Sequence, residues 1–208
     1  GLSRLTMQLL DTGTREHDEH AIAERLATTG SQMGGRFDLD RAGVTLRTLS
    51  YDKPLGQSLD LLTDILTNPI FPQDVIDREI KASLVSLQES DTRPASIASR
   101  ALHQTLFGQH PYRSTGEGSE QSLQSLTRDD LVGFHARFYR AANAVITIVG
   151  DLDEARAREI AKQVSENLPQ GSLVRERLSA NLTRSDAKEL IIPHEAAQAH
   201  IRIGMVGI

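Results

Sequence analysis

The spacing of apolar residues changes twice along this chain, and each change limits the folds that it can adopt. Residues 2–11 show a helical spacing, and a second amphipathic stretch ends at Gly30. The period then becomes two, because apolar and polar residues alternate over 33–39 and 44–49, on either side of a turn at 40–43. The chain is therefore expected to begin with two helices that lead into a β-hairpin.

After the hairpin the helical period returns. The residue before Pro69 closes one helix, because a proline disfavours helical backbone in the residue before it, and Thr127 with an acid three residues on has the form of a capping box. The β-branched run Ala144–Val149 is typical of a strand buried on both faces. Helices are expected at 52–66, 72–90, 95–107, after 127–130, and at 153–168, with further strands at 189–192 and 199–206. The pattern indicates an α+β fold, in which helices pack on one face of a largely antiparallel sheet.

Composition excludes several classes of function. The 208 residues include no cysteine, which excludes disulfides, iron–sulfur clusters, cysteine zinc sites and thiol nucleophiles. The 28 acidic and 23 basic residues give a net charge of −5, without a basic cluster of the kind that binds nucleic acid. No apolar run approaches the roughly 20 residues of a membrane span. Neither a phosphate-binding glycine loop nor a G-x-S-x-G motif occurs. A soluble globular protein is expected.

The densest polar cluster is Glu-His-Asp-Glu-His at residues 16–20. Its histidines, His17 and His20, are three residues apart, whereas two histidines of a helical zinc box are four apart. Acidic residues are also favoured at the start of a helix by its dipole. We therefore expect a solvated first turn of a helix here, and no metal site. Four other histidines show no ligand pattern: His103, His135, His194 and His200.

Residues 1–14 resemble the zinc helix of the pitrilysin/insulinase family, the inverted zinc metallopeptidases that include the mitochondrial processing peptidases. The stretch runs Gly-Leu-Ser-Arg-Leu-Thr-Met-Gln-Leu-Leu-Asp-Thr-Gly-Thr, where the family has Gly-Leu-Ala-His-x-x-Glu-His-Met-x-x-x-Gly-Thr. Further matching motifs follow in family order over nearly the whole chain: Leu61–Pro72, Asp77–Ile80, His110–Tyr112 with Gly116, Leu126–Leu131, Phe138–Tyr139, Asn143 and Ile148–Asp151. The resemblance implies the fold shared by LuxS-type metalloenzymes and processing peptidases, as a half-clamshell domain.

The resemblance fails at the residues that carry the family's chemistry. Arg4 stands at the first histidine of the inverted box, Met7 at the catalytic glutamate and Gln8 at the second histidine. The third ligand of the family, a glutamate on the next long helix, corresponds to Ser86. Zinc of this class needs two imidazoles and a carboxylate, and a further carboxylate accepts the proton of the bound water. We therefore expect no zinc cofactor and no catalytic residue in this chain.

The resemblance also implies a role for a domain that keeps the family's fold but has lost its catalytic residues. Family members are clamshells of paired homologous halves, and in several of them one half or subunit has lost the zinc box yet still closes the chamber around the peptide. This chain is accordingly expected to be a non-catalytic half that pairs with an active peptidase homologue, as in bacterial heterodimers. An extended peptide could pair with the first hairpin strand, which corresponds to the family's peptide-binding edge: Gln32, Met33, Gly34, Gly35, Arg36 and Phe37.

Residues 1–168 are expected to form the peptidase-like domain, without the hairpin that the family places before its zinc helix. Residues 169–186 are expected to be a linker, and 187–208 the first strands of a second homologous domain. Two other functions stay open. The chain could be part of a zinc endopeptidase whose active H-x-x-E-H box lies elsewhere in the parent protein, or a free-standing module that binds extended peptides. The sequence determines neither the substrate nor the compartment, cytoplasm or periplasm.

Overall fold

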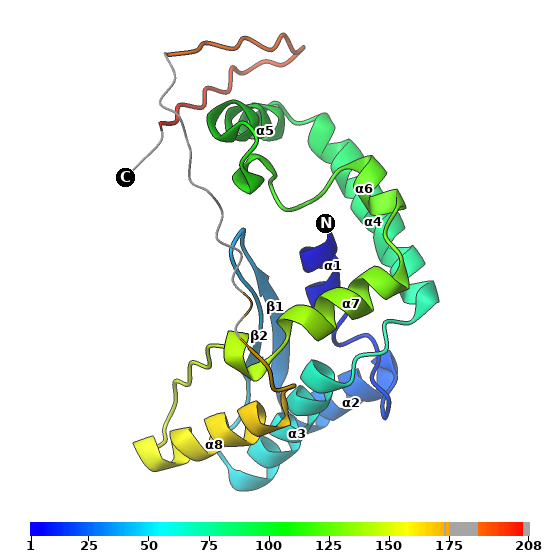
Figure 1. Ribbon diagram of the computed structural model, residues 1–208, viewed down its shortest axis with the longest axis vertical. Coiled ribbons are helices and arrows are strands. Elements are labelled where there is room, and N and C mark those ends of the chain that lie inside the picture. The colour runs from blue at the N-terminus through cyan, green and yellow to red at the C-terminus, as the bar shows by residue number, and fades with distance from the viewer. Residues whose placement is uncertain (173, 175–186, 206–208) are drawn as a thin grey trace.

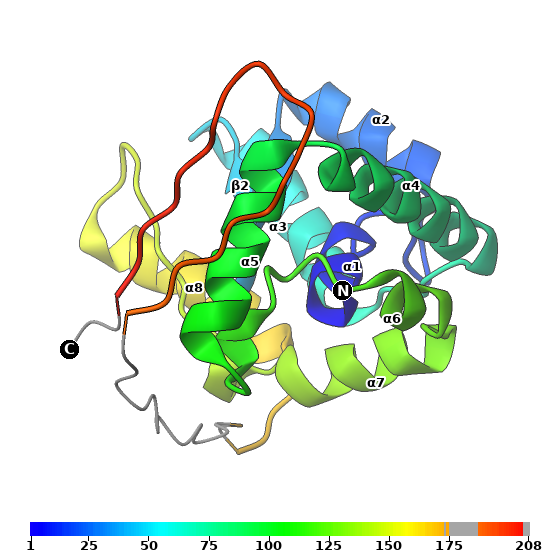
Figure 2. The ribbon, with the colours of Figure 1, turned by 90° about the horizontal axis from the view of Figure 1, so that it is seen from above.

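The computed structural model describes residues 1–172, 174 and 187–205 (Figure 1). In chain order its elements are α1 (Leu2–Gln8), α2 (Glu19–Thr29), β1 (Gln32–Phe37), β2 (Ala42–Arg47), α3 (Asp52–Thr67), α4 (Gln73–Asp91), α5 (Pro94–Phe107), α6 (Glu120–Gln124), α7 (Arg128–Phe138) and α8 (Glu154–Asn167), with 3₁₀ turns at Pro111–Arg113 and Ala141–Asn143. Figure 2 shows α1 inside a ring of helices formed by α4, α5, α6 and α7. No helix in the described part of the chain combines the length and the apolar character that a membrane crossing requires.

The hairpin lies beside α1, which packs against both of its strands. The antiparallel register pairs Gln32 with Arg47 and Phe37 with Ala42. The turn falls at 38–41, two residues earlier than expected, because the carboxylate of Asp38 accepts hydrogen bonds of 2.8 Å from the amides of residues 40 and 41. The two-stranded sheet and the helices around it confirm the expected combination of helices with antiparallel strands.

One hydrophobic core fixes α1 among its neighbours. The helix has only seven residues and no side-chain cap at its N-terminus, so its stability comes from packing and not from its own hydrogen bonds. Full burial of an aliphatic or aromatic side chain contributes about 1.5–3 kcal/mol. The buried members of this core are Leu5, Leu9, Leu10, Ile22, Leu61, Ile65, Phe71, Val75, Ile76 and Leu131. Four helices besides α1 thus hold it in place.

The expected start and stop signals of three helices are confirmed. Gly30 ends α2 in the left-handed conformation, with φ 65°, which glycine adopts without a steric penalty. Asn68, the residue before the proline, ends α3. Thr127 and Asp130 form a reciprocal capping box at the start of α7. These boundaries depend on local chemistry, which explains why they could be predicted.

The expected strand at Ala144–Val149 is wrong. Val145 and Val149 are 92% and 93% exposed, and the run belongs to no strand, although Ile148 packs against the cluster that joins α3 to α8. A strand needs the backbone of a partner, and no described residue pairs with this run. Residues 189–192 and 199–205 likewise form no strand. Most of the expected linker, 173 and 175–186, lies outside the described residues, as does 206 of the last expected strand.

Candidate functional site

The residues that we expect to occupy the box, Arg4, Met7 and Gln8, differ in burial. Met7 is only 7% exposed, whereas Arg4 is half-buried and Gln8 is exposed. Arg4 and Gln8 are one helical turn apart and share a face, as two ligands of an inverted box must. A guanidinium cation and an amide are nevertheless poor substitutes for two neutral imidazoles. Arg4 and Gln8 thus have the spacing of two box ligands but not the imidazole donors.

Met7 fills space against β1. A Cβ built on Gly35 would lie 1.9 Å from Met7 Sδ and 3.0 Å from its Cε, so only glycine at this position leaves room for the thioether. The strand does not require glycine for its backbone, because Gly35 is outside the positive-φ residues. Met7, which we predict to stand at the position of the catalytic glutamate, is thus a packing residue matched to the strand beside it.

A hollow of about 390 Å³ opens beside Met7 and Gln8, between α1, the hairpin and the start of α4. Its apolar wall is formed by Met7, Leu10, Met33, Val44 and Ile65, and its polar wall by Gln8, Asp11, Thr12, Glu19, Arg78 and Glu79. Backbone of Gly34 and Gly35 completes the lining. The hollow thus adjoins two of the residues that we predict to stand in the family's zinc box, Met7 and Gln8.

Acidic groups dominate the polar wall of the hollow. Arg78 Nη2 lies 3.0 Å from Glu19 Oε1, and its Nε lies 3.1 Å from Glu79 Oε1. Because Arg78 is 54% exposed, these pairs contribute little to stability. Burial, together with repulsion from Glu19, raises the pKa of Asp11. Asp11 has no ion-pair partner in the described ranges, so the wall carries an uncompensated negative charge when all of its acids are ionised.

The structure brings together part of the predicted site. Residues 33–35 of the predicted peptide-binding strand line the same hollow as Met7 and Gln8. Ser86 is exposed on α4, and neither Ser86 nor Arg4 lines the hollow. The acid of α4 that does reach it is Glu79, two turns before the position of the family's third ligand.

The remaining residues of the predicted peptide-binding strand lie outside the hollow. Gln32 and Arg36 are exposed. Phe37 packs against the loop after α5, where a Cβ on Gly116 would lie 2.6 Å from Phe37 Cε1. The left-handed φ of 82° at Gly116 and the approach of this ring both require glycine. The loop thus covers the end of β1 next to the hairpin turn.

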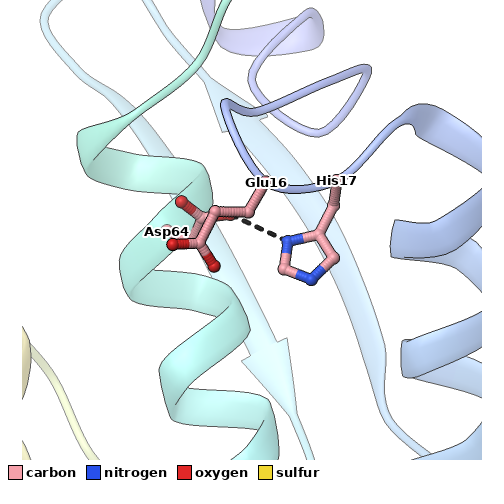
Figure 3. A group of neighbouring side chains, drawn as sticks. All are labelled: Glu16, His17 and Asp64. Atoms are coloured by element: carbon pink, nitrogen blue, oxygen red, sulfur yellow. Dashed lines mark hydrogen bonds and ion pairs between the residues drawn. The ribbon is translucent and has the colours of Figure 1, made fainter.

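A hydrogen-bonded group that no sequence pattern indicated joins the loop after α1 to the end of α3 (Figure 3). Asp64 Oδ2 accepts a hydrogen bond of 2.5 Å from Thr14 Oγ1 and lies 3.1 Å from His17 Nδ1. Asn68 Nδ2 donates to Asp64 Oδ1 over 3.0 Å. Burial alone would raise the pKa of Asp64, but the hydrogen bonds from Thr14, His17 and Asn68 together lower it.

His17 therefore does not lie in a solvated helical turn, as expected from residues 16–20. Asp18 caps α2, which begins at Glu19, so the loop before it is free to turn the imidazole inward. The side chain of His17 is 11% exposed. The spacing pattern described only the neighbours of His17 in sequence, whereas its partner Asp64 is 47 residues away.

His135 is buried and packs between α7 and α3. It is 8% exposed, its Nε2 lies 2.9 Å from the carbonyl oxygen of Leu66, and its ring stacks on Tyr139 with centroids 4.8 Å apart. Burial lowers the pKa of His135, and the hydrogen bond to Leu66 offsets part of that effect. This histidine links α7 to α3 and has no metal-binding partner in the described residues.

Two family models match this chain. The model described as Insulinase (Peptidase family M16) covers residues 1–119, and the model described as Peptidase M16 inactive domain covers residues 125–207. Arg4, Met7, Gln8 and Ser86 all lie in the part of the chain that the first model matches. The two matches do not test the predicted division at 168 and 187, which stays a prediction.

Relatives of this chain include proteins named as mitochondrial subunits. A probable mitochondrial-processing peptidase subunit beta from Arabidopsis thaliana is 26% identical over 181 residues, 87% of this chain and 34% of that protein. Subunit 1 of the cytochrome b-c1 complex of Bos taurus is 26% identical over 151 residues, 73% of this chain and 31% of that protein. The chain thus spans about a third of the length of these relatives.

Solved structures share the fold. A crystal structure of a peptidase M16 inactive domain from Pseudomonas fluorescens is 34% identical, with a TM-score of 0.80 over 83% of this chain and 42% of that one. Pitrilysin, at 17% identity, has a TM-score of 0.68 over 88% of this chain and 20% of its own. The α+β fold and the resemblance seen in the sequence are confirmed. Since one family model alone covers more than half of its residues, the chain belongs to the insulinase family, peptidase family M16.

Proposed function

We propose that this chain is a non-catalytic peptidase-family domain that pairs with an active zinc metalloendopeptidase homologue and helps to enclose its peptide substrate. The observation that carries the proposal is the set of residues at the box. Arg4, Met7, Gln8 and Ser86 stand where the family has two histidines and two glutamates, and none of them supplies an imidazole or a carboxylate. Without them the box has neither zinc ligands nor a base for the zinc-bound water.

The packing around Met7 supports the same conclusion. A glutamate at position 7 would place a carboxylate at a site only 7% exposed, against the backbone of Gly35. Burial of an unpaired carboxylate costs several kcal/mol, or shifts its pKa until it is neutral. A catalytic glutamate at position 7 would therefore require its surroundings to change as well. This supports a domain that has a structural role and no catalytic one.

The hairpin supplies a surface for a peptide. β1 pairs with β2 on one side, and no strand in the described ranges pairs with its other edge. Extended peptides bind such edges through backbone hydrogen bonds, while side-chain pockets select among them. Residues 33–35 of β1 border the acidic hollow, so a peptide on this edge would place a side chain beside Met7 and Gln8. The peptide-binding role of Gln32–Phe37 belongs to this proposal.

A second function is favoured by the length of the relatives. Because the chain spans about a third of each, a parent protein of the same size would have room for a further domain with an intact H-x-x-E-H box. In that case the present chain would be part of a zinc endopeptidase and its partner would be the rest of the parent chain. An intact box in the parent sequence supports this second function, and a box in a separate homologue supports the first.

Peptide hydrolysis by the purified chain tests the proposal. An unstructured peptide should stay intact with the chain alone, and an active H-x-x-E-H homologue should cleave it faster when the chain is added. Chelator-sensitive hydrolysis by the chain alone would contradict the proposal. Backbone amide signals of 32–37 should shift when the peptide is titrated, whereas those of the exposed α8 surface, such as Glu166, should not.

A further inference from the structure

Glu16, His17 and Asp64 bring three metal-binding groups together, apart from the degenerate box. One donor atom from each lies within 4.8 Å of the other two. Figure 3 shows the three side chains gathered between the loop after α1 and the last turns of α3. None of them lines the hollow beside Met7. Among the described residues, no other set of three or more histidine, cysteine, aspartate or glutamate side chains comes together in this way.

The distances suit a metal ion with short bonds. Zinc lies about 2.0–2.2 Å from nitrogen and oxygen ligands, which places two ligands of a tetrahedral ion about 3.3 Å apart. His17 Nδ1 and Asp64 Oδ2 are 3.1 Å apart, and their side chains are 11% and 12% exposed, so this pair is already close to the required spacing. Glu16 is exposed, and its carboxylate has no partner within the described part of the chain. It can rotate to complete the set without breaking a contact.

Hydrogen bonds around the group hold the donors in place. Thr14 Oγ1 accepts from the amides of Glu16, over 3.2 Å, and His17, over 3.0 Å, and the amide of Thr14 donates to the carbonyl of His17 over 2.7 Å. The amide group of Asn68 binds Asp64 Oδ1, which turns Oδ2 toward the imidazole. Contacts of this kind orient metal ligands and typically change affinity 10–100-fold when they are removed.

We propose that Glu16, His17 and Asp64 bind a transition-metal dication such as Zn²⁺, with water completing its coordination. One imidazole and two carboxylates suit a transition metal better than Mg²⁺, which prefers an octahedral shell of oxygen. Binding of the ion displaces the hydrogen between His17 and Asp64: the proton on Nδ1 leaves to solvent and Nε2 takes up a proton, so that His17 binds as a neutral imidazole. The ion would cross-link two segments 47 residues apart and stabilise the loop that follows α1. This role is structural and independent of the proposed pairing with a peptidase.

Titration of the metal-free 208-residue protein with ZnCl₂ tests the site. Binding is measured by calorimetry and by the change in the thermal unfolding midpoint. We expect one zinc per chain and a higher midpoint. Glu16→Gln and His17→Gln should each weaken binding by at least about tenfold. The matched controls are His20→Gln and Glu24→Gln, which alter exposed residues on α2 and should bind zinc as the parent does.

Each possible failure has a distinct meaning. Absence of heat and of a midpoint shift at millimolar zinc would overturn the site, as would equal binding by Glu16→Gln, whose exposed side chain has no structural partner to lose. Loss of binding in His20→Gln would place the ion on the surface of α2 and overturn it as well. Tight zinc that persists in the Glu16→Gln/His17→Gln double variant would instead contradict the proposed loss of the zinc box.

Discussion

Replacement of Gly35 by alanine tests whether Met7 is locked against β1. The added Cβ would lie 1.9 Å from Met7 Sδ, 3.0 Å from Cε and 3.5 Å from Cγ, so the thioether must leave its place. Methionine can adopt a new rotamer, but overpacking of a buried site typically costs about 1–3 kcal/mol. Alanine regains about 0.4–1 kcal/mol by restricting the unfolded chain. We expect the free energy of unfolding to fall by about 1–2 kcal/mol.

Urea unfolding followed by circular dichroism measures this change, with Gly34→Ala as the matched control. A Cβ on Gly34 would meet only Thr45 Oγ1, at 3.6 Å, which is an ordinary contact. In a Gly35→Ala background, Met7→Ala removes the clash, so the double variant should be more stable than the sum of the single changes by at least about 1 kcal/mol. Equal stability of the two glycine variants, or additive behaviour of the double variant, would refute the contact.

Three further predictions concern the buried His135, the capping box at Thr127 and the buried hydroxyl of Ser58. Burial lowers the pKa of His135, so as the pH falls the unfolded chain binds a proton at this residue before the folded chain does. The free energy of unfolding should therefore be constant above about pH 7 and fall as the pH drops through about 6.5. Urea unfolding at pH 7.5 and 5.5 should show a smaller loss of stability in His135→Gln than in the parent. Thr127→Ala removes one side of the capping box with Asp130 and should cost about 0.5–2 kcal/mol by thermal unfolding, whereas no loss would mean that the box is dispensable. Ser58 is 1% exposed and its hydroxyl lies 2.7 Å from that of Ser31, so Ser58→Ala should cost about 1–3 kcal/mol in the same assay, and a neutral result would count against this network.

Most helices of this fold could be predicted because their causes are local. The capping box at Thr127 and the left-handed glycine at Gly30 each depend on a few neighbouring residues. A strand depends on a second backbone, so the β-branched composition of Ala144–Val149 indicated a tendency that the described residues do not satisfy. The helix Glu120–Gln124 has only five residues, too few for a helical period to show in the sequence.

The candidate site also has features that could be predicted from the sequence and features that could not. The proposed loss of the box residues at Arg4, Met7 and Gln8 could be inferred from the sequence, since it consists of changed residue types. The contact of Met7 with Gly35 and the group around Asp64 depend on proximity between distant parts of the chain, which the spacing of residues does not reveal. For His17 the local pattern was misleading. The neighbouring acids favour the start of a helix, but they do not show that the side chain of His17 turns inward to Asp64.

The uncovered run at Ala144–Val149 has a consequence for the handling of this chain. It contains no charge and no proline, and its two outer valines are more than nine-tenths exposed. Extended apolar segments of this length are templates on which other copies add, edge to edge, into insoluble fibrils. A lysine at Val145 would act as a gatekeeper against that growth without touching Ile148, which faces the helices. We therefore expect any precipitation of this chain to begin at these six residues.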